Sequence, residues 1–155
     1  MSDTTMSDTT MSDTTIVLIR HGETLGESSI RLNGITDVAL SPLGIRQMER
    51  ATTVLAGHDF ERVVSSPMRR SREGNAIVRG TRSPEIVPNF REMNFGNWET
   101  WTWAEVEARD PTGFRTSRAA KADFQFPGGE SRFGFYDRVK QAALDTFSSS
   151  TQSTV

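Results

Sequence analysis

Five consecutive residues near the N-terminus combine groups that are suited to handling phosphate. Residues 20–24 read Arg-His-Gly-Glu-Thr. The planar guanidinium of Arg20 matches phosphate oxygens, and Gly22 lets backbone amides come close to an anion. The imidazole of His21 between them is a nucleophile. The segment therefore predicts phosphoryl transfer, although a strand-end arginine and histidine satisfied by nearby carboxylates would explain the same residue types equally well.

The element that must position this segment is the short apolar run that precedes it. Residues 16–19 read Ile-Val-Leu-Ile, bounded by polar residues on both sides. A continuous β-branched run of this length predicts a parallel strand that is buried on both faces. Residues 20–24 would then follow the carboxyl end of that strand, which is where open α/β sheets place their ligand crevice.

Strands and helices are predicted to alternate along the following sixty residues. The expected elements are a helix from Ser41 to Gly57, a strand at 62–65, a helix at 68–78 and a strand at 85–87. This order predicts an α/β layered fold with right-handed crossovers.

Beyond Pro88 the chain becomes aromatic and loop-like. Trp98, Trp101 and Trp103 either wall a substrate pocket or cover the edge of the sheet, and the residue types do not decide between the two. A short helix is predicted at 103–109. A last helix is predicted to start by Ser131, and its inward face would carry Phe135, Val139, Ala142, Ala143 and Phe147.

Composition restricts the protein class. The chain has 155 residues, 35% hydrophobic and 25% charged, with a formal net charge of −2, which fits one soluble domain without a global field for nucleic acid or a membrane surface. It has no cysteine and two histidines, so a disulfide scaffold, a thiolate metal site and an all-histidine zinc site are excluded. A cytoplasmic location is predicted because no secretory signal and no membrane span is visible. Composition leaves the oligomeric state open.

Residues 20–24 resemble the signature of the histidine phosphatase superfamily, which includes the cofactor-dependent phosphoglycerate mutases and the α-ribazole phosphatases. Further matching segments follow in the family's order: 31–37, 40–44, 65–71, 91–99 and 127–131. The likeness runs from about Ile16 to Val139, and residues 94–99 and 127–131 are most similar to the α-ribazole phosphatase branch. The implied fold is a phosphoglycerate mutase-like three-layer α/β/α sandwich with a mostly parallel sheet.

The resemblance also assigns roles to individual residues. It implies that His21 takes the phosphoryl group, that Arg20 and Arg70 clamp the phosphate, and that Glu92 is the general acid and base. Substrate contacts are implied for Thr24, Asn33 and Gly34, in addition to Arg20 and Arg70. Without the resemblance, Glu92 reads as a surface residue in an aromatic loop. Arg69 and Arg72 are predicted to be solvated surface charges, because helical geometry points them away from Arg70.

The implied activity is metal-independent and needs no cofactor. The predicted substrate is a small phosphorylated metabolite such as α-ribazole phosphate, and the predicted reaction is hydrolysis through a phosphohistidine. A phosphoglycerate mutase-like phosphotransferase and a catalytically impaired phosphate-binding remnant are the alternatives. Neighbouring guanidinium groups should keep His21 neutral, and burial among Phe90, Phe95 and Trp98 should raise the pKa of Glu92.

The chain departs from the family pattern at several positions. It lacks the second histidine that completes the family's phosphate pocket, and His58 is predicted to lie in a surface loop rather than to replace it. Glu27 stands where many members have an asparagine that contacts phosphate, so it either points away or changes substrate preference. Thr100 stands where phosphatase relatives often have glycine.

Three regions are predicted along the chain. Residues 1–15, three copies of Met-Ser-Asp-Thr-Thr, are expected to be a disordered leader, and residues 16–147 a histidine phosphatase-like domain. Residues 148–155 are expected to be a Ser/Thr-rich tail. Because this tail resembles the family's connector to a further strand, the domain is expected to lack its last strands at the C-terminus.

Overall fold

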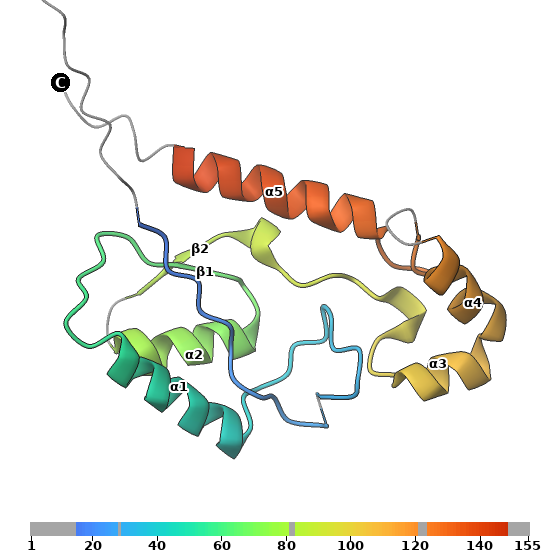
Figure 1. Cartoon of the computed structure of the whole chain (residues 1–155), viewed down its shortest axis with the longest axis horizontal. Coiled ribbons are helices and arrows are strands. Elements are labelled where there is room, and N and C mark those ends of the chain that lie inside the picture. The colour runs from blue at the N-terminus through green and yellow to red at the C-terminus, as the bar shows by residue number, and fades with distance from the viewer. Residues whose placement is uncertain (1–14, 28, 81–82, 121–123, 149–155) are drawn as a thin grey trace, which may run out of the picture.

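The computed structural model of the chain describes residues 15–27, 29–80, 83–120 and 124–148. Two short strands and several helices follow one another along these residues (Figure 1). The α-helices are α1 (Pro42–Val54), α2 (Arg69–Arg79), α3 (Trp103–Arg109), α4 (Pro111–Ala119) and α5 (Arg132–Ser148). The strands are β1 (Val64–Ser65) and β2 (Glu85–Ile86), and the 3-10 turns are η1 (Pro88–Phe90) and η2 (Gly96–Trp98).

The sheet of the described residues consists of β1 and β2, which pair in parallel with Val64 opposite Glu85 and Ser65 opposite Ile86. Helix α2 is the crossover between them. The strands lie between α1 and α2 on one side and α5 on the other (Figure 1). This arrangement confirms the predicted α/β fold and places the end of β1 and the end of β2 at the same edge of the sheet.

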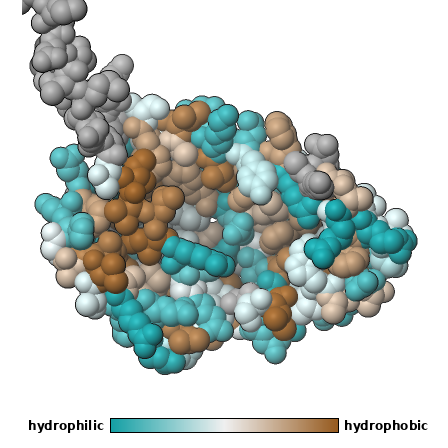
Figure 2. Space-filling view, in the orientation of Figure 1, coloured by the Kyte–Doolittle hydropathy of each residue, from teal (hydrophilic) through white to brown (hydrophobic). Residues whose placement is uncertain are grey.

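The prediction of a buried strand at residues 16–19 is wrong for the described structure. The four residues are assigned to no strand, and Ile16, Val17, Leu18 and Ile19 are 50, 41, 86 and 46% exposed. Apolar surface gathers over this segment (Figure 2). A strand is buried on both faces only where neighbours pair with its edges and helices cover it, and the described ladder contains β1 and β2 alone.

Helix α1 begins as its sequence predicts. Ser41 is the N-cap, its hydroxyl accepts a hydrogen bond from the amide of Gly44 at 3.0 Å, and Pro42 occupies the first helical position. The helix packs on α2 through a small core of Leu40, Met48 and Val78. This packing fixes the orientation of α2, which carries Arg70.

The main core is aromatic and is centred on Trp98, which is 1% exposed. Its other buried members are Leu32, Met93, Val106, Phe124 and Phe126. Trp101 packs against this core, and Trp103 meets Trp98 edge to face with ring centroids 6.1 Å apart. Trp98 therefore belongs to the core and Trp101 packs against it, whereas Trp103 contacts Trp98 but is 38% exposed.

Helix α4 was not predicted, although its start carries a clear signal. Asp110 is the N-cap, its carboxylate accepts a hydrogen bond from the amide of Gly113 at 2.8 Å, and Pro111 is the first helical residue. Helix α5 was predicted. It begins after Ser131, and its predicted inward face contains Ala142, which is 4% exposed.

Thr100 has a φ of 68°, which lies in the left-handed region that favours glycine. We expect Thr100→Gly to raise the free energy of unfolding by about 0.5–1 kcal/mol, because it removes backbone strain at the cost of extra entropy in the unfolded chain. Thr53→Gly, in exposed helix α1, should lower stability instead. Urea unfolding of both variants checks the opposite signs, and equal losses would contradict a strained Thr100.

The predicted leader and tail lie almost entirely outside the described residues. Residues 1–14 and 149–155 are not described, and Ser148 is the last residue of α5. The predicted domain boundaries therefore stay predictions. Within the described ranges, no helix combines the length and apolar character needed to cross a membrane.

Candidate phosphate-handling site

Three chain segments meet at one pocket of about 220 Å³. Ile19, Arg20 and His21 come from the first described segment, Arg70 comes from the first turn of α2 after β1, and Glu92 follows β2 and η1. Ser66, Met68, Ser71, Phe90, Arg91, Phe135 and Val139 complete its walls. The pocket thus lies beyond the carboxyl ends of parallel strands, where α/β sheets place ligands.

His21 is oriented by its own backbone neighbour. Its Nδ1 lies 2.7 Å from the carbonyl oxygen of Gly22. Because a carbonyl oxygen only accepts, Nδ1 carries the hydrogen and donates it, so the neutral ring has its lone pair on Nε2. Gly22 is itself packed against the backbone of Gly44, whose carbonyl oxygen would lie 2.3 Å from an added Cβ. Any side chain at position 22 would therefore disturb the histidine.

The electrostatic surroundings of His21 favour the neutral imidazole. Partial burial lowers the pKa of His21 below its usual value of 6.5. The hydrogen bond to Gly22 raises this pKa in opposition, and so does the negative charge of Glu92. The positive charges of Arg70 and Arg20 lower the pKa further. The net effect is a ring that stays unprotonated at neutral pH.

Arg70 is buried, with 3% of its surface exposed. Its Nη1 donates to the carbonyl oxygen of Thr36 at 3.1 Å, and its Nη2 donates to that of Gly34 at 2.9 Å. Burial lowers the pKa of Arg70, whereas the negative charges of Glu92 and Asp37 raise it. Two carbonyl contacts use part of the five-donor fork, and the rest of the guanidinium remains for an anion in the pocket.

Arg69 and Arg72 lie at the surface, as predicted. Arg69 pairs with Glu73 at 2.7 Å with its side chain 55% exposed, and Arg72 is exposed. Arg20 is exposed at the pocket edge, and it makes no hydrogen bond or ion pair with another residue in the described ranges. Arg20 is therefore available as a second cation beside His21.

Glu92 lines the pocket in a half-buried position. Its Oε1 accepts a hydrogen bond from the amide of the next residue, Met93, at 2.8 Å. Phe90 shares the pocket wall with Glu92, whereas Phe95 and Trp98 belong to the aromatic core. The carboxyl group therefore has one of its three predicted aromatic neighbours in the pocket.

The predicted substrate contacts Thr24, Asn33 and Gly34 are absent from the pocket lining. Thr24 is buried, with 3% of its surface exposed, and pairs with Leu40 in an antiparallel bridge. Gly34 lies behind Arg70 and accepts one of its hydrogen bonds. It stands where an added Cβ would be 1.9 Å from the carbonyl oxygen of Met93. Gly34 therefore supports Arg70 rather than facing the pocket directly.

Glu99 is a supporting residue to which the sequence analysis assigned no role. Its carboxylate accepts from the amides of Gly34, Ile35 and Thr36 at 3.2, 3.1 and 3.1 Å, and from the amide of Phe95 at 3.0 Å. The hydroxyl of Thr36 also donates to it. Residues 34–36 are thus held between this carboxylate and Arg70. The pattern of backbone donors is not visible in a linear sequence.

His58 and Glu27, which concern two departures from the family pattern, both lie outside the pocket lining. His58 is exposed, stacks on Phe60 at 6.2 Å, and is absent from the pocket lining, as predicted. Glu27 forms an ion pair with Arg31 at 3.0 Å and is likewise absent from the lining. Of the two explanations for Glu27, the structure favours a carboxylate that points away.

The histidine and the arginines at the carboxyl edge of this α/β sheet are groups suited to binding phosphate. Residues 16–155 match the family described as the histidine phosphatase superfamily, branch 1, and the chain belongs to this family. The resemblance noted in the sequence is therefore confirmed.

Individual relatives agree with this family. Glucosyl-3-phosphoglycerate phosphatase of Mycolicibacterium vanbaalenii is 36% identical over 126 residues, which cover 79% of this chain and 55% of that protein. The α-ribazole phosphatase structure from Shigella flexneri superposes with a TM-score of 0.76 at 26% identity, covering 84% of this chain and 66% of that one. A phosphoglycerate mutase structure from Thermus thermophilus gives a TM-score of 0.61 at 32% identity, with coverages of 79% and 66%.

These matches confirm the phosphoglycerate mutase-like fold. The chain spans about half the length of the curated mycobacterial relatives it matches. The activities in the names of the relatives belong to those proteins.

Proposed function

We propose that this chain is a metal-independent phosphatase of small phosphomonoesters that works through a phosphohistidine at His21. The observation that carries the proposal is the Nδ1–H of His21 donating to the Gly22 carbonyl, which leaves the Nε2 lone pair free within a pocket lined by three arginines. Family membership and the phosphatase names of the relatives support the reaction class. A cytoplasmic location remains a prediction from sequence.

In the first step, Nε2 of His21 attacks the phosphorus of the ester. The bond from phosphorus to the leaving oxygen breaks, and Glu92 gives its proton to that oxygen. Arg70 and Arg20 hold the phosphoryl oxygens, whose charge spreads in a loose transition state. In the second step, water attacks the phosphohistidine, Glu92 takes the proton of that water, and inorganic phosphate leaves with His21 restored.

The size and lining of the pocket support a small phosphomonoester as the substrate. A volume of about 220 Å³ suits a phosphoryl group and the part of the substrate next to it. Phe90, Phe135 and Val139 add apolar walls, and Arg91 adds a further cation. The named substrates of the relatives, glucosyl-3-phosphoglycerate and α-ribazole phosphate, both belong to the class of phosphomonoesters. We propose α-ribazole phosphate as the first of these to assay.

The direct test is to trap the covalent intermediate. The chain is mixed with a chromogenic phosphomonoester and quenched in alkali, in which phosphohistidine survives, and the phosphorylated residue is located by mass spectrometry. We expect a single phosphorylated histidine at position 21 in the wild type and in His58→Gln, and none in His21→Ala. A phosphoryl group on any other residue, or none in a folded chain that hydrolyses the ester, would refute the proposal.

The lowered pKa of His21 predicts how its protonation depends on pH. Protonation removes the Nε2 lone pair, so attack is lost as pH falls through the pKa of His21, which lies below 6.5. A proton NMR titration of His58→Gln, which leaves one imidazole, measures this midpoint. In Arg20→Gln the midpoint should rise, because a positive charge that lowers the pKa is gone. A wild-type midpoint above 6.5 would contradict the described surroundings.

The role of Glu92 predicts a dependence on the leaving group. In Glu92→Gln we expect kcat/KM for an alkyl phosphate, which reports the transfer to His21 and not the later attack of water, to fall about 10²-fold, because a poor leaving group needs the proton. The kcat/KM for p-nitrophenyl phosphate, whose leaving group needs no proton, should fall less than about 10-fold. Steady-state assays of both esters with wild type and variant provide the comparison. Equal losses for the two esters would count against Glu92 as the acid.

Phosphate binding without turnover is the second candidate. The pocket lining contains one imidazole, His21, and the described residues place His58 elsewhere on the surface. If only binding is retained, inorganic phosphate should shift the His21 imidazole signal while no ester is hydrolysed. A phosphoryl group that passes from His21 to an added alcohol faster than to water would indicate a mutase-like transferase instead.

A further inference from the structure

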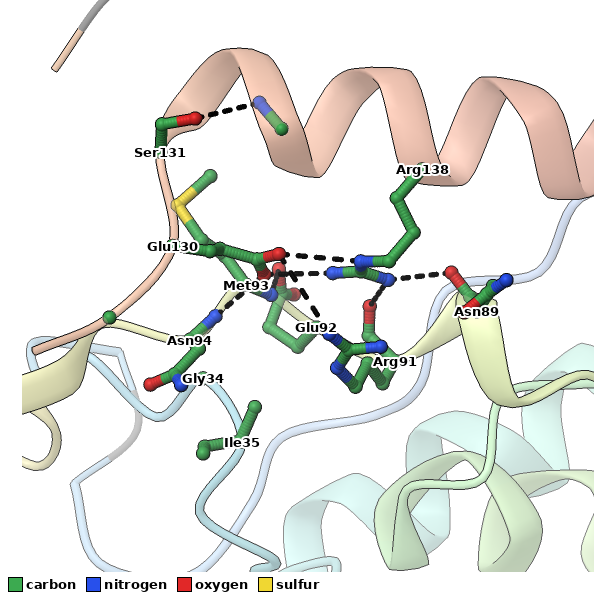
Figure 3. A network of polar contacts seen from close by, with 12 residues as sticks. Gly34, Ile35, Asn89, Arg91, Glu92, Met93, Asn94, Glu130, Ser131 and Arg138 are labelled. Atoms are coloured by element: carbon green, nitrogen blue, oxygen red, sulfur yellow. Dashed lines mark hydrogen bonds and ion pairs between the residues drawn. The ribbon is translucent and has the colours of Figure 1, made fainter. Parts of the chain in front are cut away.

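The backbone that carries Glu92 is held at both ends by side chains from outside the segment (Figure 3). At the first end, Nη1 of Arg138 donates to the carbonyl oxygens of Asn89 and Arg91 at 2.6 and 3.2 Å. At the other end, the amide of Asn94 donates to Oε1 of Glu130 at 2.8 Å. The amide of Glu130 returns a bond to the carbonyl of Asn94 at 3.0 Å.

The two side chains that hold these ends are also bound to each other. Nη2 of Arg138 lies 2.8 Å from Oε1 of Glu130, and Nε of Arg138 lies 3.3 Å from Oε2. The side chains are 13% and 18% exposed. Such two-point pairing fixes direction as well as distance. Because removing the charges from water offsets much of their attraction, the pair contributes more to geometry than to net stability.

The carboxylate of Glu92 has little support of its own. Within the described ranges, its one hydrogen bond comes from the amide of Met93, the next residue in the chain. The position of the carboxylate therefore follows the path of the backbone from Asn89 to Asn94. In Figure 3 the Arg138–Glu130 pair spans this path, with Glu92 beside it.

We propose that the ion pair of Arg138 and Glu130 is the positioning device for Glu92. The pair holds both ends of the segment and thereby sets where the Glu92 carboxyl stands relative to the substrate oxygen. Helix α5 supplies Arg138, and its next residue, Val139, lines the pocket, so α5 relates the Glu92 segment to the pocket wall. The inference rests on the proposed acid and base role of Glu92. Arg138 and Glu130 act through Glu92 and touch no reacting atom.

The test compares Arg138→Gln and Arg138→Lys with Lys140→Gln. The last variant removes one positive charge from an exposed position of the same helix. The first readout is the amide resonance of Met93 in a proton–nitrogen NMR spectrum, which reports the Glu92 carboxylate directly. We expect this resonance to move in Arg138→Gln and to stay in place in Lys140→Gln. Arg138→Lys keeps the positive charge but lacks the planar guanidinium, so we expect an intermediate shift of the Met93 resonance. This variant replaces Arg138→Gln in the comparison if Arg138→Gln does not fold.

The second readout is the leaving-group dependence of hydrolysis. In Arg138→Gln we expect kcat/KM for an alkyl phosphate to fall about 10-fold, with less than a 2-fold change in kcat/KM for p-nitrophenyl phosphate. In a Glu92→Gln background the same substitution should change kcat/KM less than 2-fold, because the group it positions is already lost. If the pair were merely structural, Arg138→Gln would lower kcat/KM for both esters to the same extent, in the wild-type background and in the Glu92→Gln background.

The outcomes separate the two proposals. If the wild type forms no phosphohistidine, the proposed function fails, and if Glu92→Gln lowers kcat/KM equally for both esters, Glu92 is not the acid. In either case the Met93 resonance still decides whether the pair positions Glu92. If the Arg138 variants fold and both the Met93 resonance and the leaving-group dependence match wild type, the positioning role is overturned.

Discussion

Replacing His21 by alanine is expected to lower phosphomonoester hydrolysis by about 10³-fold or more, because the covalent route loses its nucleophile. In the structure, His21 is the imidazole in the pocket lining, and its orientation is set by the 2.7 Å contact with the Gly22 carbonyl. No other side chain of that lining offers an unprotonated nitrogen at neutral pH. The rate of p-nitrophenolate release at saturating substrate measures the loss.

The matched control is His58→Ala, which removes the other histidine of the chain from an exposed position. It should retain the wild-type rate and the wild-type circular dichroism spectrum. Comparable rates in folded His21→Ala and wild type would mean that the observed hydrolysis does not pass through His21.

Replacing Arg70 by alanine is expected to have the second largest effect, about 10³-fold in kcat/KM, because a buried cation no longer balances the charge on the phosphoryl oxygens. The substitution also removes the Arg70 donor from the buried carbonyl oxygen of Gly34, whereas the carbonyl oxygen of Thr36 keeps the amide of Val38 at 3.1 Å. A buried carbonyl left unpaired costs about 1–3 kcal/mol, so the unfolding midpoint in urea should fall as well. Activity and unfolding are measured on the same preparation.

Two further variants separate charge from architecture. Arg70→Lys keeps the positive charge but cannot reach both carbonyls and an anion at once, so it should restore part of the activity and little of the stability. Arg72→Ala removes an exposed arginine from the same helix and should change neither quantity by more than about 0.5 kcal/mol. An Arg70→Ala variant as active and stable as Arg72→Ala would remove Arg70 from the site.

Local sequence signals were sufficient for most of the helices. Ser41 and Pro42 mark the start of α1. On the predicted inward face of α5, Ala142 is buried and the other four residues are half-buried, whereas the buried Thr146 was not predicted. Helix α4 was overlooked although Asp110 and Pro111 carry the same kind of start signal. These features were predictable because a cap or a periodic face depends on residues within one or two turns.

The apolar run at residues 16–19 is not the buried strand that its composition predicts. Its composition is that of a buried strand, yet in the described structure it lies outside the ladder and is exposed. A strand that is buried on both faces needs a paired neighbour and helices that cover both faces, and no property of four residues determines whether those are in place. The position of the tryptophans could not be predicted for the same reason, since packing around Trp98 depends on residues as distant in the sequence as Leu32 and Phe124.

The sequence by itself identified the superfamily, through a histidine and an arginine placed directly after an apolar run and through five further motifs. Tertiary structure alone decided which atoms surround these residues. Three contacts are of this kind: Nδ1 of His21 with the Gly22 carbonyl, the backbone amides that donate to Glu99, and the Arg138–Glu130 ion pair. The first depends on the direction of the backbone, and the others join groups that are separated in the sequence. Residue types and spacing do not encode those geometries, because hydrogen-bond direction is set only when the chain has packed.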